Sequence, residues 1–274
     1  MDKVTINQLF IQYIPKRKNG RKCKVKYWRV LKAILYKLKT GMQWRQLPMK
    51  QLFGRHKYSW QSVYYHFNKW CKCGEFKQIL YSILDKYKNL IDVSITNLDG
   101  SHTTAKRGGQ AVGYQGRKKS KTTNMLFLTD KNGIPLACSP PVSGNHNDLF
   151  EIKKTVSKMI EDIESIAINP AGIFLNADAG FDSKELKEFF DSKEIIHNID
   201  HNKRRSIEDK EKTYVFDNLL YTNRFVVEQV NAWIDSFKTL LVRFETNAEI
   251  WHQWHYLAAS VLFLRKINKL TFYF

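Results

Sequence analysis

The sequence pattern changes character at about residue 90, and this change constrains the fold more than any other feature. Before it, apolar residues recur at helical spacing with lysines and arginines between them, as in "VKYWRVLKAILYKLKT". After it, short β-like runs alternate with helical segments, which is typical of an α/β domain. We therefore expect two domains, one over residues 1–90 and one over residues 91–274.

The first part predicts three amphipathic helices, over 25–40, 59–73 and 76–88, and Ser59 is a candidate N-cap of the second. Three such helices suit a helix-turn-helix-like unit, in which one helix enters the major groove of DNA. The 59–73 helix is the candidate reader of DNA. Its polar face presents Gln61, Ser62, Tyr65, His66 and Lys69. A basic helical bundle that inserts nothing into a groove fits the same spacing.

The basic charge is concentrated in this first part. Residues 1–90 hold 21 Lys and Arg against three acids, whereas residues 91–274 hold 24 against 23. An excess confined to one third of the chain indicates a polyanion partner, because neutralising phosphates releases counterions. A merely solvated basic surface is the alternative. The apolar runs fall short of the ~20 residues of a membrane span, so we expect no membrane partner and a cytoplasmic, nucleoid-associated protein.

The second part predicts a sheet with carboxylates at the ends of strands. Strand candidates lie at 93–100, 122–130, 134–142, 172–178 and 195–199, and helices at 148–163, 183–191, 222–243 and 247–266. Asp99 closes the first strand and Asp178 the fourth, so the two converge if these strands are neighbours. Asp182, just before "SKELKEFF", has the layout of a helix N-cap.

A third carboxylate lies in the 222–243 helix. Its polar stripe contains Tyr221, Arg224, Glu228, Asn231, Asp235 and Lys238, whereas its other faces are apolar. A carboxylate on so apolar a helix needs a partner. One candidate partner is a divalent cation shared with Asp99 and Asp178, and hard carboxylate oxygens favour Mg²⁺ or Mn²⁺. The other is Arg224, one turn earlier, as a simple ion pair.

Three motifs in order, "LDGSHT", "LNADAGFDS" and "YTNRFVVEQVNAWIDSFKTLLVRFE", resemble the DDE transposases of bacterial insertion sequences, specifically the insertion-sequence-five group. The stretches "WRVLKAILYKLKTGMQWRQLP" and "SWQSVYYHFNKW" resemble the helix-turn-helix domain upstream in those proteins. The likeness covers residues 25–245. It implies an α/β fold with an RNase H-like mixed sheet flanked by helices, preceded by an all-α, helix-turn-helix-like domain.

The resemblance also implies a metal-dependent DNA transposase. In it, Asp99, Asp178 and Glu228 are the catalytic acids and hold two Mg²⁺ or Mn²⁺ ions. Its partners are double-stranded DNA, first the terminal inverted repeats for hydrolysis and then target DNA for strand transfer. Joining two ends calls for at least a homodimer. The alternatives are an RNase H-like nuclease that cuts without joining, and a non-catalytic DNA-binding regulator or decayed transposase.

Further DNA contacts are expected from basic residues near the acids. The glycine-studded segment 103–123 follows Asp99 directly, and we expect its basic side chains to hold phosphates over the site. These are Lys106, Arg107, Arg117, Lys118, Lys119 and Lys121. On the helix of the third acid, Arg224 and Lys238 are the candidate contacts. Related transposases often carry a lysine where this chain has Asp235.

Overall fold

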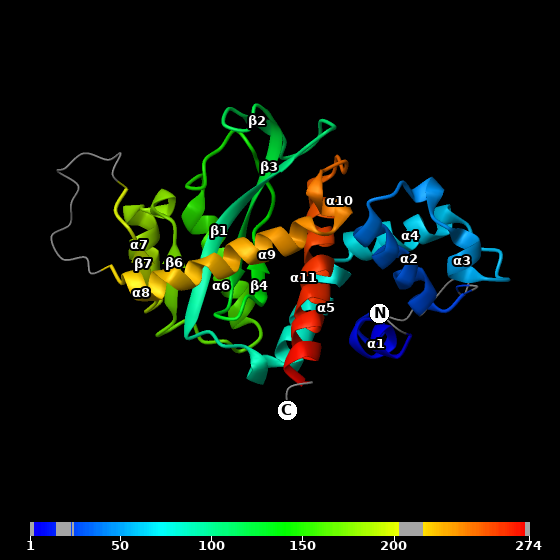
Figure 1. Cartoon of the computed structure of the whole chain (residues 1–274), viewed down its shortest axis with the longest axis horizontal. Helices are drawn as coiled ribbons and strands as arrows, with labels where there is room; N and C mark the ends of the chain where they lie inside the picture. The colour runs from blue at the N-terminus through cyan, green and yellow to red at the C-terminus, as the bar shows by residue number, and fades with distance from the viewer. Residues whose placement is uncertain (1–2, 15–22, 24, 203–215, 272–274) are drawn as a thin grey trace.

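The computed structural model describes residues 3–14, 23, 25–202 and 216–271, and these form a mixed seven-stranded sheet with helices around it (Figure 1). The strands are β1 (Ile95–Thr104), β2 (Gly113–Gln115), β3 (Ser120–Thr129), β4 (Pro135–Cys138), β5 (Val142–Ser143), β6 (Phe174–Ala177) and β7 (Ile196–Ile199). Their order is β2-β3-β1-β6-β7, and β4 and β5 also pair with β3.

Strand β1 lies at the centre, antiparallel to β3 and parallel to β6. Strand β7 continues the parallel side beyond β6. Parallel neighbours need a crossover, and here helices α6 (Ile152–Glu164) and α7 (Lys184–Ser192) supply it. This arrangement confirms the predicted mixed α/β, RNase H-like fold.

Strand β1 is longer than the sequence pattern predicts. The prediction that Asp99 closes this strand is wrong, because the antiparallel ladder with β3 continues as far as Thr104 opposite Thr122. The parallel pairing with β6, in contrast, stops at Leu98 opposite Ala177. Asp99 therefore lies where β1 loses its β6 neighbour, and that edge is open on one side.

The N-terminal helices are α1 (Lys3–Leu9), α2 (Tyr27–Thr40), α3 (Met49–Phe53), α4 (Trp60–Lys72) and α5 (Glu75–Lys86), which confirms the three predicted ones. Helix α2 ends at Gly41, whose φ of 69° suits glycine. Ser59 Oγ accepts a hydrogen bond from the Ser62 amide at 3.2 Å, as an N-cap does. The placement of His66 on the polar face is wrong, because His66 is buried against the rings of Tyr27 and Trp70.

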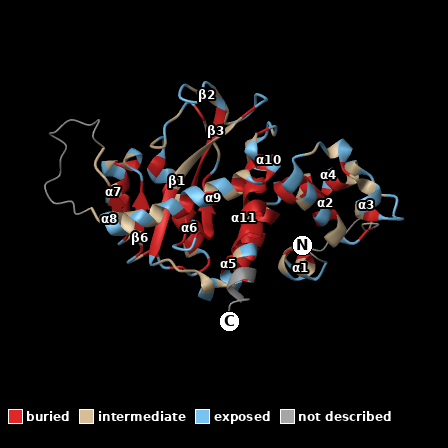
Figure 2. Cartoon of the chain, viewed as in Figure 1, coloured by how far each residue is buried: buried red, intermediate tan, exposed pale blue. Residues whose placement is uncertain are grey.

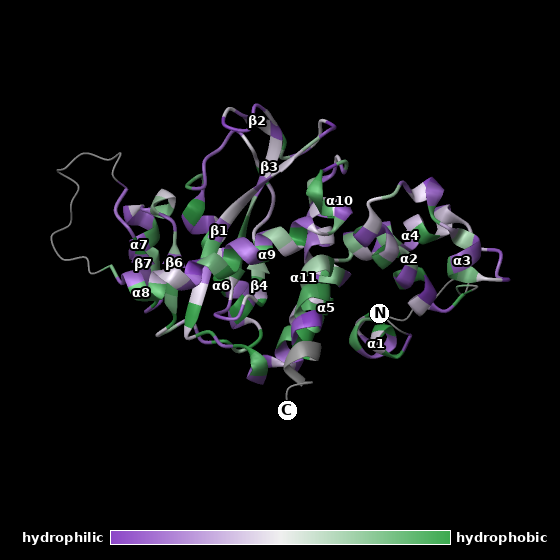
Figure 3. Ribbon diagram, viewed as in Figure 1, coloured by the Kyte–Doolittle hydropathy of each residue, from purple (hydrophilic) through white to green (hydrophobic). Residues whose placement is uncertain are grey.

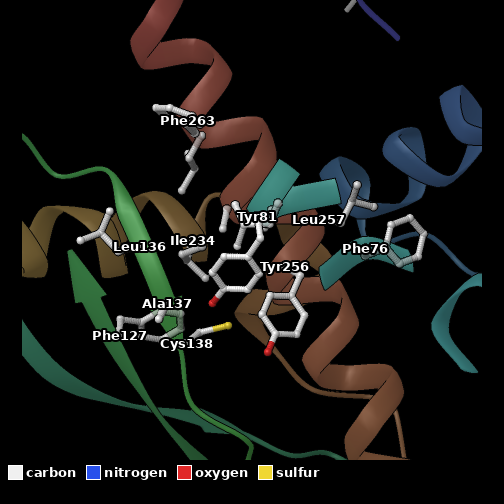
Figure 4. Packing of buried hydrophobic residues seen from close by; sticks show 14 of the residues in the cluster. Phe76, Tyr81, Phe127, Leu136, Ala137, Cys138, Ile234, Tyr256, Leu257 and Phe263 are labelled. Atoms are coloured by element: carbon white, nitrogen blue, oxygen red, sulfur yellow. The ribbon is translucent and has the colours of Figure 1, made fainter. Parts of the chain in front are cut away.

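Helix α11 (Ala248–Thr271), predicted at 247–266, stands between the N-terminal helices and the sheet (Figure 1). Tyr256 of this helix and Tyr81 of α5 lie beside Cys138 of β4, and Leu257 lies on the side of Phe76 (Figure 4). One continuous buried core results, shown red in Figure 2. Hydrophilic residues gather instead on the loops around β2 (Figure 3). Among the helices described, α11 included, none is both long and apolar enough to cross a membrane.

The predicted helix over 222–243 is broken into pieces. It comprises α8 (Asn218–Tyr221), a 3₁₀ turn (Thr222–Arg224), α9 (Phe225–Asp235) and α10 (Lys238–Leu241). The break follows Ser236, whose hydroxyl donates to the Trp233 carbonyl at 2.6 Å, and Phe237 then adopts an extended backbone. Helix α9 crosses the face of β1 and β3 (Figure 1), whereas Lys238 is no longer part of its polar stripe.

The prediction that Asp182 caps helix α7 is also wrong. Ser183 occupies the N-cap position, and its side chain makes no capping hydrogen bond. Asp182 is buried instead, with Lys187 Nζ at 2.7 Å and His201 Nδ1 at 3.3 Å from its carboxylate. It also accepts a hydrogen bond from the Asn202 amide at 3.0 Å. Asp182 thus ties the start of α7 to the chain that leaves β7.

Candidate active site

The three predicted acids converge on one arginine. Asp99 comes from β1, Asp178 directly follows β6, and Glu228 lies in the first turn of α9. Arg224 Nη2 lies 3.5 Å from Asp99 Oδ1 and 3.3 Å from Asp178 Oδ2, and Arg224 Nη1 lies 2.8 Å from Glu228 Oε1. Adjacent strands bring the aspartates together as predicted, and the crossing of α9 adds the glutamate.

The guanidinium supplies the positive charge at the centre of these acids. The ion pair that the sequence left open as an alternative is therefore present, and it extends to both aspartates. In the part of the chain that the structure describes, no group of three Asp, Glu, His or Cys side chains is arranged to hold a metal ion. Arg224 instead lies within 3.5 Å of all three carboxylates.

The donor set nevertheless fits a divalent cation. Three carboxylates offer the hard oxygens that Mg²⁺ and Mn²⁺ prefer. The Asp178 and Glu228 side chains are 52% and 61% exposed, so an ion from solvent can reach them. Asn231 Oδ1 is buried without a hydrogen-bond partner among the described residues, while the same amide donates to Asp99. Such an oxygen suits a cation or its hydrating water.

Asp99 is the most enclosed of the three acids, with a side chain 18% exposed. Asn231 Nδ2 donates a hydrogen bond to Asp99 Oδ2 at 3.1 Å. Burial raises the pKa of Asp99 to about 6, the Arg224 charge opposes this rise, and the charges of Glu228 and Asp148 add to it. A carboxylate that is costly to ionise gains most from a cation beside it.

Asp178 is held by the backbone that follows it. Its Oδ1 accepts a hydrogen bond from the Gly180 amide at 2.8 Å, at the start of the 3₁₀ turn Ala179–Phe181. Its Oδ2 is the atom that faces Arg224. One oxygen thus fixes the orientation of the carboxylate, and the other remains available to a cation.

Two residues outside the predicted catalytic set, Asp148 and Asn231, support the acids. Asp148 Oδ1 accepts a hydrogen bond from Asn124 Nδ2 at 2.6 Å, and a Cβ at Gly100 would lie 2.6 Å from the same oxygen. The glycine after Asp99 in "LDG" therefore permits the approach of a fourth carboxylate. Asn231 was visible in the polar stripe, three residues after Glu228, but its contact with Asp99 depends on how α9 crosses the sheet.

The predicted phosphate-binding residues of the β1–β2–β3 region are all exposed; they are Lys106, Arg107, Arg117, Lys118, Lys119 and Lys121. Lys118 Nζ donates to the His102 carbonyl at 2.6 Å. Burial raises the pKa of Asp235, and the charge of Lys118 opposes this rise. Asp235, at the position where related transposases often carry a lysine, is thus close to Lys118.

The other predicted DNA contacts lie outside the cluster of acids. On α4, Gln61 and Tyr65 are exposed and Ser62 and Lys69 are half-buried, but this helix is on the far side of α11 from α9 (Figure 1). Lys238 is exposed on α10, which packs against α2. Arg224 belongs to the cluster itself.

An RNase H-like sheet with three acids clustered beside its central strand is the arrangement that the resemblance to DDE enzymes predicts. The family described as "Transposase DDE domain" matches residues 88–263, and the family described as "Putative transposase of IS4/5 family" matches residues 5–80. The chain belongs to the DDE transposase family, and it is a transposase that acts on DNA. Enzymes of this family generally use divalent metal ions.

Solved structures with some similarity are also transposases. "Mos1 transposase paired-end complex with left transposon end" is 11% identical, with 89% of this chain and 79% of that chain covered, at a TM-score of 0.29. "Crystal structure of a pre-cleavage Mos1 transpososome" is 11% identical, with 92% and 82% covered, at a TM-score of 0.30. Neither similarity adds to the family assignment. No curated protein sequence matches the chain.

Proposed function

We propose that this transposase cuts DNA at the ends of its own element and joins the freed 3′ ends to target DNA. In this proposal Asp99, Asp178 and Glu228 hold two Mg²⁺ or Mn²⁺ ions. The observation that carries it is the convergence of three carboxylates on the single cationic group of Arg224. Carboxylates so close repel one another unless a cation lies among them, and divalent ions are the natural alternative to a guanidinium.

Bound ions would supply the Lewis acidity that activates an attacking hydroxyl and stabilises a departing oxygen. The chain contributes three differently held carboxylates. Asp99 is oriented by Asn231, and Asp178 is oriented by the Gly180 amide. Glu228 is the most exposed of the three, so its carboxylate is free to turn toward an ion when Arg224 releases it.

The partner in this proposal is double-stranded DNA. The polar face of α4 reads the terminal inverted repeats, and the exposed lysines and arginines of the β1–β2–β3 region hold phosphates near the acids. Two ends must be cut and joined together, so we propose a homodimer as the active form. We further propose that residues 1–90 are the DNA-binding domain and 91–274 the catalytic one, and that the protein works in the cytoplasm at the nucleoid.

Incubation with labelled DNA tests the catalytic proposal. The substrate carries the inverted repeats that flank the gene, with Mg²⁺ or Mn²⁺ present. Asp178→Asn should lower specific end cleavage by about 10²- to 10³-fold while its affinity for the repeats stays within about twofold. Glu185→Gln, an exposed acid in the first turn of α7, is the matched control and should cleave like the wild type. Cleavage by Asp178→Asn at the wild-type rate would contradict the assignment.

The same reaction separates the alternatives. A supercoiled plasmid added as target should acquire the labelled ends if the protein joins as well as cuts. Cut ends without joined product would indicate a nuclease. Binding of the repeats without cleavage in either metal would indicate a regulator or a decayed enzyme.

A further inference from the structure

Three neighbouring parallel strands carry the same pattern of asparagine, apolar residue and aspartate where their parallel pairing ends. The tripeptides are Asn97-Leu98-Asp99 within β1, Asn176-Ala177-Asp178 at the end of β6 and Asn198-Ile199-Asp200 at the end of β7. Asn97 lies opposite Asn176, and Asn176 lies opposite Asn198. Because side chains alternate along a strand, each asparagine shares a face of the sheet with the aspartate two residues later.

The three asparagines are almost completely buried, with exposures of 0%, 0% and 1%. A buried amide is costly unless it is hydrogen-bonded. Asn176 Nδ2 donates to Asn97 Oδ1 at 3.1 Å, and Asn198 Nδ2 donates to Asn176 Oδ1 at 2.9 Å. The three side chains thus form a ladder across β1, β6 and β7, which we name the asparagine ladder.

The remaining hydrogen bonds of the ladder go to residues 217–223, which we name the docking segment. Asn97 Nδ2 donates to Asn223 Oδ1 at 2.9 Å, and Asn176 Nδ2 donates to the Leu220 carbonyl at 3.0 Å. Asn198 exchanges two bonds of 3.0 Å with the backbone of Asp217. Every asparagine of the ladder therefore binds the docking segment.

Apolar packing contributes little to this attachment. Neither α8 nor the 3₁₀ turn after it contains a buried residue, and the Leu219 side chain is exposed. Apolar contacts are non-directional, whereas a set of amide hydrogen bonds fixes both position and orientation. The docking segment leads directly into Arg224, and Glu228 follows one turn later.

We infer that the asparagine ladder is a positioning device for the active site. It anchors the docking segment on the face of the sheet that also carries Asp99 and Asp178, two residues before these acids. The ladder thereby positions Arg224 and Glu228, which follow the docking segment, next to the two aspartates. The expected effect on catalysis rests on the proposed function of the three acids. The anchoring of the docking segment by the ladder does not depend on that proposal. Asn97, Asn176 and Asn198 are positioning residues in this inference, because they act through their hydrogen bonds to one another and to the docking segment.

Asn176→Leu is the most direct test, since this nearly isosteric change removes the middle of the ladder. Hydrogen exchange on the full metal-free chain should show backbone amides of residues 217–228 exchanging roughly tenfold faster, through local opening. Val156→Ala on α6 is the control, because Val156 is a buried core residue away from the ladder. It should lower global stability without this local effect.

Cleavage kinetics give the second readout. Asn176→Leu should lower kcat by about 100-fold through misplacement of Glu228, with KM for the repeat DNA within about twofold. Asn198→Leu, at the edge strand, removes the two Asp217 bonds and the bond to Asn176 Oδ1. It leaves the bonds to Leu220 and Asn223 in place, so it should give an intermediate exchange rate. It carries the test if Asn176→Leu does not fold.

The inference is overturned if both ladder variants behave like Val156→Ala, with unchanged local exchange and wild-type kcat. Failure of the proposed function would look different. In that case Asp178→Asn would cleave normally, while the exchange experiment on the ladder would still give its own answer.

Discussion

Arg224 Nη1 lies 2.8 Å from Glu228 Oε1, while Nη2 of the same guanidinium is turned toward the two aspartates. Arg224 Nε is buried with no hydrogen-bond partner in the described residues. Arg224 therefore contacts the acids through Nη1 and Nη2 and not through Nε. A guanidinium and a divalent cation compete for the same carboxylates, so the metal ions that we propose at these acids would displace Arg224 at least in part.

Replacing Arg224 by glutamine tests this competition. Without the guanidinium, the carboxylates repel one another, and we expect the metal-free protein to lose about 1–2 kcal/mol of unfolding free energy, a value reduced for the exposure of Asp178 and Glu228. The rise in Tm on adding Mg²⁺ or Mn²⁺ should be larger than in the wild type. Thermal unfolding in chelator and in metal measures both.

A surface ion pair supplies the control for Arg224→Gln. Lys184 lies 3.9 Å from Glu188 on α7, and both side chains are exposed. Lys184→Gln should change stability by less than about 0.5 kcal/mol and leave the metal response as it is. A metal-induced rise in Tm that is unchanged or smaller in Arg224→Gln would contradict competition.

Two adjacent glycines give a matched pair for the basic segment after β1. Gly109 has a φ of 142°, and a Cβ there would lie 2.4 Å from the Thr246 carbonyl oxygen. Gly108 has no atom within 4 Å of its would-be Cβ. Gly109→Ala should therefore cost about 1–3 kcal/mol, whereas Gly108→Ala should cost less than about 0.5 kcal/mol.

DNA binding should separate the same two glycine variants. The Gly109 backbone sits against the segment before α11, so its displacement also moves the exposed Lys106 and Arg107. We expect weaker binding of repeat DNA by Gly109→Ala, and binding like the wild type by Gly108→Ala, in gel-shift titrations at constant salt. Equal affinities would indicate that this segment does not contact DNA.

The buried ion pair between Asp182 and Lys187 lies outside the cluster of acids, and we expect it to stabilise the fold. Asp182→Asn removes the charge that faces Lys187 at 2.7 Å and leaves that ammonium partly buried. We expect a loss of about 2–4 kcal/mol in urea unfolding. Asp191→Asn, whose exposed carboxylate lies 3.4 Å from His197, should cost much less. Equal losses in the two variants would show that burial of Asp182 is unimportant.

Local sequence patterns correctly predicted those elements whose structure depends only on neighbouring residues. The helices α2, α4 and α5 follow from apolar spacing, and Ser59 follows from N-cap chemistry. The family resemblance and the strand pattern together placed Asp99 beside Asp178. These features need only neighbouring residues, or strands of known order, to be predicted.

Features that depend on partners far along the chain were missed. The extension of β1 past Asp99 requires β3, and the position of Asp182 requires Lys187 and the chain after β7. The asparagine ladder joins residues 79 and 22 positions apart, so each asparagine looks like an isolated polar residue in an apolar run. Only the repeated pattern "NLD", "NAD" and "NID" signals the ladder before its register is known.

Two buried histidines of α11 should make the protein less stable as the pH falls. Burial lowers the pKa of His252 to about 4 and of His255 to about 3, from an ordinary 6.5. Both are neutral and bound to backbone carbonyls, His252 Nε2 at 3.2 Å from Cys138 O and His255 Nδ1 at 3.0 Å from Trp251 O. The unfolded chain takes up these protons below about pH 6.5 and the folded chain does not.

Folded pKa values below the unfolded ones mean that this contribution is complete above about pH 6.5 and is lost as the pH falls. Each histidine should steepen the loss by about 1.4 kcal/mol per pH unit. His255→Phe keeps a ring between Phe127 and Trp251 but cannot titrate. Urea unfolding from about pH 5 to about pH 7.5 should therefore show a shallower slope for His255→Phe, by about that amount near pH 5 and by almost nothing near pH 7.5. A wild-type slope in His255→Phe would contradict the assignment of this acid sensitivity to α11.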